Sequence, residues 1–233
     1  MTTTRRSMLK MVATTPLLFA AACTTTTTDD KPKTTNRRPT TKMPFGAEPD
    51  FPSYALMYAA VQDGEFNVPA IPYEKIPEQY LRQVVRDTTG EQAGSIVVDT
   101  RNHYLYLVLG NGKAVRYGVG LGRAGFEWSG RAVMQWKRKW PTWTPPAEMI
   151  ERQPELEKYS AENGGMEPGL KNPLGARAHY IFQDGKDTLY RLHGSPEWSS
   201  IGKSVSSGCV RLMNQDVIDL YTRAYNGAPI LVK

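Results

Sequence analysis

Residues 95–119, SIVVDTRNHYLYLVLGNGKAVRYGV, carry the pattern that decides the fold of this 233-residue chain. Three runs of β-branched, aromatic and aliphatic residues are separated by two polar turns, the second of which is Asn111-Gly112. Such runs predict strands, and Asn-Gly between two of them is a strong hairpin signal. The predicted strands cover residues 95–99, 103–109 and 114–119. The stretch therefore predicts two successive β-hairpins.

More strands than helices are predicted outside this stretch. Strand patterns cover residues 131–137, 179–182, 188–193 and 230–233. Helical spacing predicts one helix over 76–86 and another from an Asn214 N-cap to Asn226-Gly227. The buried stripe expected for the later helix is Val217, Ile218, Tyr221, Ala224 and Tyr225. Many short strands with few short helices predict a mostly β domain.

Residues 136–169 predict a long, irregular insertion with several prolines, many charges, Trp140 and Trp143. Long loops inside compact domains are more often functional than filler. We expect this insertion to act as a lid over the functional site. Trp140 and Trp143 are candidate substrate-binding residues, and the alternative is that they pack the lid itself.

The N-terminus predicts an export signal over residues 1–22. Arg5-Arg6 supplies a twin arginine, an apolar run follows, and small residues end at Ala22. That run is shorter than the roughly 20 residues that a membrane-spanning helix needs. Cys23 follows directly, so a lipid on Cys23 and ordinary cleavage after Ala22 both stay open.

The remaining organisation follows from composition. Residues 23–46, rich in Thr, Lys, Arg and Pro, predict a disordered tether, followed by an N-terminal extension at 47–93 and the main domain at 94–233. The formal net charge is +6, and loss of residues 1–22 would lower it by three. This mild charge, without a basic stripe interleaved with aromatics, argues against a nucleic-acid partner. Three histidines and one cysteine in the body do not form a metal-binding pattern, so we expect no metal and no cofactor.

Cys209 is the strongest candidate for chemistry. It stands in Ser206-Ser207-Gly208-Cys209-Val210-Arg211, sixteen residues after His193, which suits a cysteine nucleophile with a histidine base. The backbone N–H groups of Gly208 and Cys209 could stabilise the oxyanion of a tetrahedral intermediate. The alternative is a small buried hydrophobic residue without a catalytic role.

Four further residues have weaker signals. Arg211 suits a substrate carboxylate or the bracing of its own loop. Asp216 is expected to support the start of the later helix rather than to join the catalytic pair. His103 is expected to be structural or solvated at its hairpin, and His179 to be an ordinary strand residue rather than a cleft residue.

Several separated motifs occur in an order that resembles the L,D-transpeptidase family, the YkuD-type catalytic domain. They are His193-Gly194, Ser200-Ile201-Gly202, the segment from Ser206 to Arg211, Asn214-Gln215-Asp216 and, upstream, Asn172-Pro173-Leu174-Gly175-Ala176-Arg177-Ala178. The resemblance covers residues 94–233 and leaves out the tether and residues 47–93. It implies a β-sandwich or barrel-like catalytic domain.

The resemblance also implies a reaction and residue roles. Cys209 would attack the L,D peptide bond of a peptidoglycan stem peptide, D-alanine would leave, and an amine would then attack the thioester. His193 would be the base, and the Gly194 carbonyl would orient its imidazole. Many members have histidine where this chain has Ser207, which is expected to affect substrate orientation or the thiol pKa.

Three functions stay open at this point. The first is an L,D-transpeptidase that cross-links stem peptides or joins an envelope protein to the wall. The second is a carboxypeptidase or hydrolase on the same scaffold, and the third is a catalytically silent wall-binding lipoprotein. The expected location is the periplasm or cell envelope, with membrane attachment only through a lipid on Cys23.

Overall fold

The computed structural model describes residues 48–122, 129–206 and 208–233. The predicted export signal, the predicted tether with Cys23, and Ser207 lie outside these residues. The described residues all belong to one compact unit. Across these three ranges, no helix has the length and apolar character needed to cross a membrane.

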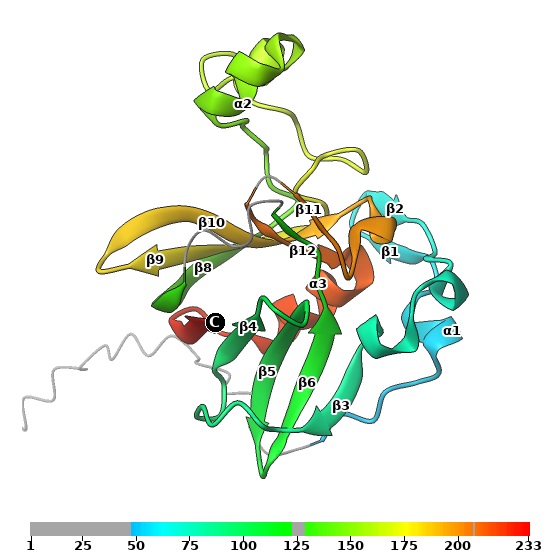
Figure 1. Ribbon diagram of the computed structural model, residues 1–233. Coiled ribbons are helices and arrows are strands. Elements are labelled where there is room, and N and C mark those ends of the chain that lie inside the picture. Colours follow the sequence, from blue (N-terminus) through cyan, green and yellow to red (C-terminus); the bar gives the residue numbers. More distant parts are fainter. Residues whose placement is uncertain (1–47, 123–128, 207) are drawn as a thin grey trace, which may run out of the picture. The chain divides into compact units, whose positions relative to one another are not determined.

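A nine-stranded sheet dominates the structure, in the order β12-β10-β9-β8-β13-β4-β5-β6-β3 (Figure 1). Its strands are β3 Gln83–Arg86, β4 Ile96–Asp99, β5 Tyr104–Gly110, β6 Lys113–Gly118, β8 Gly130–Lys139, β9 Arg177–Gln183, β10 Lys186–Ser195, β12 Val210–Met213 and β13 Ala228–Val232. The pairs β10–β12 and β13–β4 are parallel, and the other neighbours are antiparallel. This content confirms the prediction of a mostly β domain.

The remaining elements are short. Two small sheets pair β1 Val61–Asp63 with β2 Phe66–Val68, and β7 Leu121–Gly122 with β11 Ser204–Ser206. The α-helices are α1 Tyr54–Met57, α2 Ala147–Arg152 and α3 Asn214–Arg223, and the 3₁₀ turns are η1 Tyr73–Lys75, η2 Glu78–Tyr80, η3 Pro154–Tyr159 and η4 Trp198–Ser200.

The two hairpins predicted from residues 95–119 are confirmed as β4, β5 and β6. Their antiparallel register places Ile96 opposite Leu107, and Leu107 opposite Val115. Asn111 and Gly112 both have positive φ, 49° and 75°, as the tight turn between two twisted strands requires. In Figure 1 these strands lie below β8, β9 and β10 and run at a steep angle to them.

The main core lies between the two halves of the sheet, with α3 beside them. Its fully buried side chains come from both halves and from the helix, among them Leu107, Met134, Ile181, Leu192 and Val217. The helix α3 packs on β9, β10 and β12. Burial of this apolar surface is the main force that fixes β10 and β12 in place.

The prediction of a helix over residues 76–86 is wrong. Only the 3₁₀ turn η2 forms there, and Gln83 begins the edge strand β3, which pairs with β6. Val84 and Val85 are β-branched and suit a strand. The ladder hydrogen bonds offered by β6 therefore outweigh a weak helical spacing over a short run.

The late helix forms where it was predicted, with different ends. Met213 is the N-cap residue and makes no side-chain cap, whereas the Asn214 side chain accepts a hydrogen bond from the Ala176 N–H at 2.9 Å. The helix ends at Arg223, so Ala224 and Tyr225 lie beyond it, and Tyr225 is exposed. Of the predicted stripe within the helix, Val217 is buried, Ile218 and Tyr221 are only partly buried, and Leu220 is buried instead.

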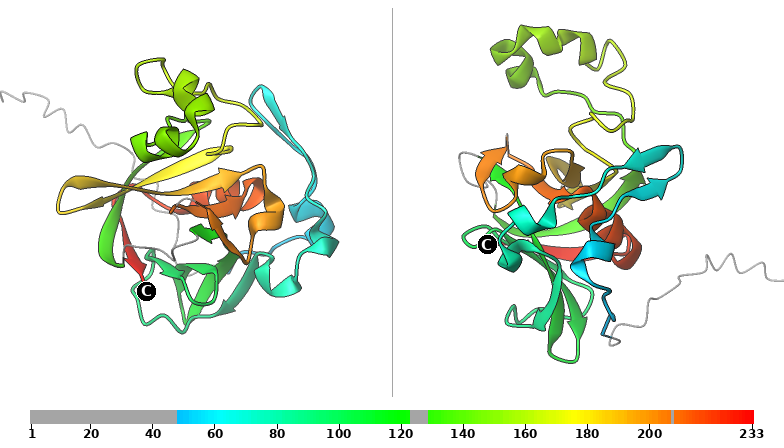
Figure 2. Two further views of the ribbon diagram at one scale, coloured as in Figure 1. Left: turned by 45° about the horizontal axis from the view of Figure 1, so that its top comes forward. Right: turned by 90° about the vertical axis from the view of Figure 1, so that its right-hand side faces the viewer.

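The insertion begins later than predicted, because β8 continues to Lys139. From Trp140 onward it contains α2 and η3, and α2 projects away from the sheet (Figures 1 and 2).

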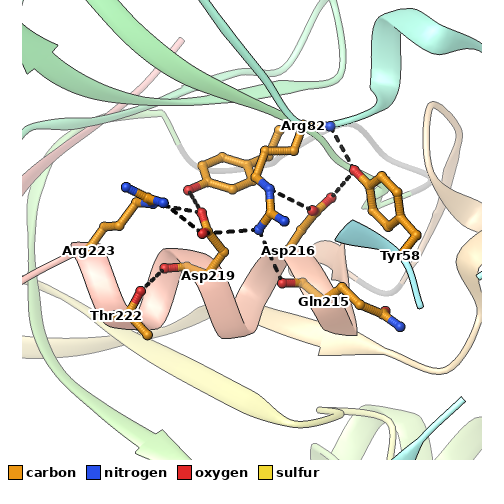
Figure 3. Close-up of polar contacts among 8 residues, drawn as sticks. Tyr58, Arg82, Gln215, Asp216, Asp219, Thr222 and Arg223 are labelled. Carbon is orange, nitrogen blue, oxygen red and sulfur yellow. Dashed lines mark hydrogen bonds and ion pairs between the residues drawn. The ribbon is translucent and has the colours of Figure 1, made fainter. Parts of the chain in front are cut away.

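The N-terminal extension is joined to α3 by a buried polar network (Figure 3). The Arg82 guanidinium lies 3.8 Å from Asp216 Oδ1 and 3.2 Å from Asp219 Oδ1. The Tyr58 hydroxyl donates to Asp216 Oδ2 at 3.4 Å and accepts the Arg82 backbone N–H at 2.7 Å. Asp216 thus lies in the first turn of α3, as predicted, and faces the extension.

Candidate active site

Parallel pairing of β10 with β12 brings the two candidate catalytic residues together. His193 lies opposite Arg211, and Leu192 lies opposite Val210. Cys209 directly precedes β12, so it lies beside the part of β10 that directly precedes His193. One pair of neighbouring strands therefore brings together two residues that are sixteen positions apart in the sequence.

A cavity of about 840 Å³ opens over this pair of strands. His193, Cys209 and Arg211 line one side of it. The other side belongs to the insertion and includes Trp143, Met149, Leu156 and Tyr159. The insertion therefore forms a wall of the cavity that contains the thiol, in the place expected for a lid.

The imidazole of His193 is held in one tautomer. Its Nδ1 lies 2.6 Å from the Gly194 carbonyl oxygen. Because a carbonyl only accepts, Nδ1 donates to it, and Nε2 of the neutral ring is left as the basic nitrogen. Burial lowers the pKa of His193 to about 4, although hydrogen bonds to the backbone carbonyls of Gly194 and Pro173 act in the opposite direction. The ring is therefore a neutral base at neutral pH.

Gly194 and Asn214 fix the other side of this histidine. A side chain at Gly194 would collide with Asn214 Oδ1 and approach Val217 Cγ1 to 2.9 Å. Asn214 Oδ1 is itself fixed by the Ala176 N–H. Only glycine therefore fits between β10 and α3 at position 194. This close packing fixes the Gly194 carbonyl, which orients His193.

Cys209 is half-buried and lines the cavity. Burial raises its pKa, against a backbone hydrogen bond with Arg191 and the positive charges of Arg191 and Arg211. A raised thiol pKa beside a lowered imidazole pKa describes a neutral pair in the resting protein. The proton would then leave the thiol as the sulfur attacks, rather than beforehand.

Gly208 precedes the thiol with a φ of +127°, a conformation that L side chains rarely adopt. Glycine is therefore required by the backbone that presents Cys209. Ser207, the other predicted residue of this loop, lies outside the described residues.

Arg211 is fixed by its backbone and paired through its side chain. Its N–H and carbonyl both bond with Gly120, at 2.8 and 2.9 Å. Its Nη1 lies 2.7 Å from Glu197 Oε2, and both residues line the cavity. Arg191, which also lines the cavity, is held by two contacts to Asp187 at 2.7 and 2.8 Å. Glu197 was not anticipated, because nothing in the surrounding sequence marks it.

The structure separates the two candidate tryptophans. Trp143 lines the cavity, and its backbone pairs with Met166 in both directions, at 3.0 and 2.7 Å. Trp140 is absent from the cavity lining and donates its indole N–H to Asp63 Oδ2 at 2.8 Å. Its ring packs against that of Phe66 in a tilted arrangement, with the ring centroids 4.1 Å apart. Their spacing of three residues gave no sign of this difference.

Asn172 is a second residue that the sequence reasoning did not single out by itself. Its side-chain amide donates to the carbonyls of Pro141, Met166 and Glu167 at 3.0 to 3.1 Å, and its Oδ1 accepts the Leu174 N–H at 2.9 Å. It is fully buried. Asn172 thus ties together the first and last residues of the insertion.

The other histidines lie away from the cavity lining. His179 is buried in β9 with Nδ1 3.3 Å from the Leu192 carbonyl, and burial lowers its pKa to about 3. His103 Nε2 lies 3.0 Å from Ser204 Oγ. No group of three or more His, Cys, Asp or Glu suited to a metal ion occurs within the described ranges.

Comparison with known proteins identifies a family and several relatives. The family model of the L,D-transpeptidase catalytic domain, YkuD, matches residues 93–232. The Escherichia coli (strain K12) protein named Probable L,D-transpeptidase YbiS is 30% identical over 66% of this chain and 47% of its own. The Probable L,D-transpeptidase ErfK/SrfK of the same strain is 31% identical over 67% and 47%. The chain thus spans about half the length of these relatives.

Among solved structures, the Brucella melitensis protein described as a probable carnitine operon oxidoreductase caia is 42% identical, over 67% of this chain and 96% of that chain. Its TM-score to this chain is 0.47, and its description concerns that protein alone. The family assignment rests on the match over residues 93–232, which include His193 and Cys209. This chain belongs to the L,D-transpeptidase catalytic domain family.

Proposed function

We propose that this protein is a peptidoglycan L,D-transpeptidase with Cys209 as nucleophile and His193 as base. The observation that carries the proposal is the convergence of both side chains in one cavity, with His193 fixed so that Nε2 is its basic nitrogen. Membership of the family supports the peptidoglycan stem peptide as substrate.

In the first half-reaction, Sγ of Cys209 forms a bond to the carbonyl carbon of the stem peptide's third residue. The thiol proton passes to His193 Nε2 during this attack. When the tetrahedral intermediate collapses, the C–N bond breaks and the same proton goes to the nitrogen of the leaving D-alanine. The product is a thioester on Cys209.

In the second half-reaction, an amine attacks the thioester carbonyl. The new C–N bond forms as the C–S bond breaks, and His193 carries the proton of the amine to the departing sulfur. The backbone N–H groups of Gly208 and Cys209 are the proposed donors to the oxyanion in both halves. Gly208 supports this role because its φ of +127° shapes the loop that presents them.

The insertion is proposed to shield the thioester. Trp143 and its neighbours face the thiol across the cavity, and water kept out of this space cannot compete with the amine. A hydrolase on the same scaffold stays the second candidate, with water as acceptor. A silent wall-binding protein is disfavoured by the assembled Cys209 and His193.

Export and partners are also proposals. The twin arginine and small residues before Cys23 support secretion to the periplasm or envelope, where the stem peptides lie. The acyl acceptor is proposed to be an amine of a second stem peptide or of an envelope protein. A lipid on Cys23 would be the only attachment to the membrane.

The test is intact-protein mass spectrometry during turnover of a defined tetrapeptide stem. The wild-type protein should gain the mass of the acyl tripeptide and release D-alanine, and Cys209→Ala should do neither. The matched control is Ser53→Ala, which removes a small polar group from an exposed residue of the N-terminal extension that makes no side-chain cap and lies outside the cavity lining. Release of D-alanine by Cys209→Ala at the wild-type rate would overturn the proposal.

A further inference from the structure

The guanidinium of Arg211 already forms an ion pair with a carboxylate of the protein. Glu197 Oε2 lies 2.7 Å from Arg211 Nη1, and both residues line the cavity that contains Cys209. The Glu197 side chain is 66% exposed and the Arg211 side chain 20% exposed. The carboxylate can therefore swing into solvent while the guanidinium stays at the cavity.

The pair is not needed to hold either backbone in place. Arg211 is fixed by two backbone hydrogen bonds with Gly120. Glu197 donates its N–H to Ser195 Oγ at 3.1 Å, and its carbonyl accepts from Ser200 Oγ at 2.7 Å. Loss of the Glu197 charge would leave these four contacts intact.

The other cavity arginine is also engaged. Arg191 binds Asp187 through two contacts, so each arginine that lines the cavity has a carboxylate partner. A carboxylate that enters from solvent must compete with one of them. The Arg211–Glu197 pair is the easier one to displace, because an exposed ion pair with a single contact is weak and an arginine–carboxylate fork is stronger.

We propose that Glu197 determines the specificity for donor peptides by competing with their C-terminal carboxylate for Arg211. This inference rests on the proposed function. A donor that ends in a free carboxylate displaces Glu197 and forms its own ion pair with Arg211. A donor with an amidated C-terminus leaves the Glu197 pair in place and gains nothing from Arg211.

Binding can be measured without chemistry in the full chain carrying Cys209→Ala. The probes are one tetrapeptide stem as its C-terminal acid and the same peptide as its C-terminal amide, titrated by calorimetry. Adding Glu197→Gln should tighten binding of the acid about fivefold and leave the amide unchanged. Adding Arg211→Gln instead should abolish the preference for the acid. Glu65→Gln, an exposed residue outside the cavity lining, makes the same charge change and should leave both peptides unaffected.

Two results would overturn the inference. Weaker binding of the acid in Glu197→Gln would show that Glu197 positions Arg211 rather than competing for it. An equal change for acid and amide would show that Arg211 does not contact the terminal carboxylate. Failure of the proposed function is distinguishable from both, because it appears as an absence of acyl-enzyme in the wild-type protein.

Discussion

At the scale of single residues, the chemistry depends on the protonation states of two side chains. Burial lowers the pKa of His193 to about 4 and raises the pKa of Cys209. Both shifts favour uncharged groups, so a reactive thiolate is not stored in the resting site. His193 must therefore take the proton in the same step in which sulfur attacks, and the orientation by Gly194 becomes decisive.

This arrangement predicts the pH dependence of acylation. In the wild-type protein, the rate should fall on the acid side near pH 4, where His193 becomes protonated, and not near the ordinary histidine pKa of about 6.5. In His193→Ala the limb near pH 4 should be replaced by a rise that follows ionisation of the thiol, and the rate at pH 7 should drop about 10²- to 10⁴-fold. Activity should return only above the ordinary thiol pKa of about 8.5, because burial raises that of Cys209.

The measurement is the rate of acyl-enzyme formation from pH 3.5 to 10, followed by rapid-quench mass spectrometry. His103→Ala serves as the control, since His103 lies outside the cavity lining and contacts Ser204. An acid limb near pH 6.5, or a His193→Ala protein as fast as wild type at pH 7, would contradict a neutral thiol–imidazole pair.

At the scale of secondary-structure elements, one buried amide holds the insertion to the sheet. The Asn172 side chain donates to three carbonyls at the two ends of the insertion and accepts the Leu174 N–H. Pro173 and Leu174, which follow it, line the cavity. The same residue thus connects the position of the lid with the floor of the site.

Asn172→Ala should loosen the insertion more than the core. Removing the amide leaves buried carbonyls without their donor, at a cost of about 1–3 kcal/mol. We expect faster hydrogen exchange over residues 141–169, a several-fold rise in KM for the stem peptide, and a smaller fall in kcat. Asn163→Ala is the control within the insertion, because its amide donates to Glu157 and Ser160, which belong to the same segment. Uniform faster exchange across β4, β5 and β6 would instead indicate general destabilisation.

The sequence predicted some of these elements and site residues and missed others. Residues 95–119 predicted their strands because alternation and Asn111-Gly112 agree on one local structure. Residues 76–86 did not predict the strand that forms there, because β3 depends on pairing with β6, about thirty positions away in the sequence. His193 and Cys209 could be paired by residue type and order, whereas Glu197 could not. Glu197 pairs with Arg211 because of the path of the loop that follows β10, and no local sequence pattern specifies that path.

At the scale of the whole domain, the N-terminal extension is part of the fold rather than an addition to it. Its strand β3 completes the edge of the large sheet, and its Arg82 and Tyr58 meet Asp216 of α3. A second link joins Asp63 of β1 to the buried Arg177, at 2.6 and 2.8 Å. The resemblance that began at residue 94 could not reveal this, because the extension carries none of the family motifs.

The network around Asp216 predicts how stability depends on pH. Burial raises the pKa of Asp216 to about 7 in the folded protein, above its ordinary value of 3.8, although Arg82 and Tyr58 act in the opposite direction. The folded state therefore binds a proton that the unfolded state releases between these pH values. The stabilisation from this proton is complete below about pH 3.8 and is lost as the pH rises through about 7.

Asp216→Asn should remove this dependence. From pH 5 to pH 7 the wild-type free energy of unfolding should lose about 2 kcal/mol through Asp216, and the asparagine variant should show a curve flatter by that amount. The measurement is denaturant unfolding at both pH values, with Asp184→Asn, in an exposed turn, as the control for the charge change. If Asp216 were instead ionised and stabilised by Arg82, removing it would leave a buried guanidinium with one partner fewer. The variant would then be destabilised more at pH 7 than at pH 5, and that result would reverse the sign argued for this group.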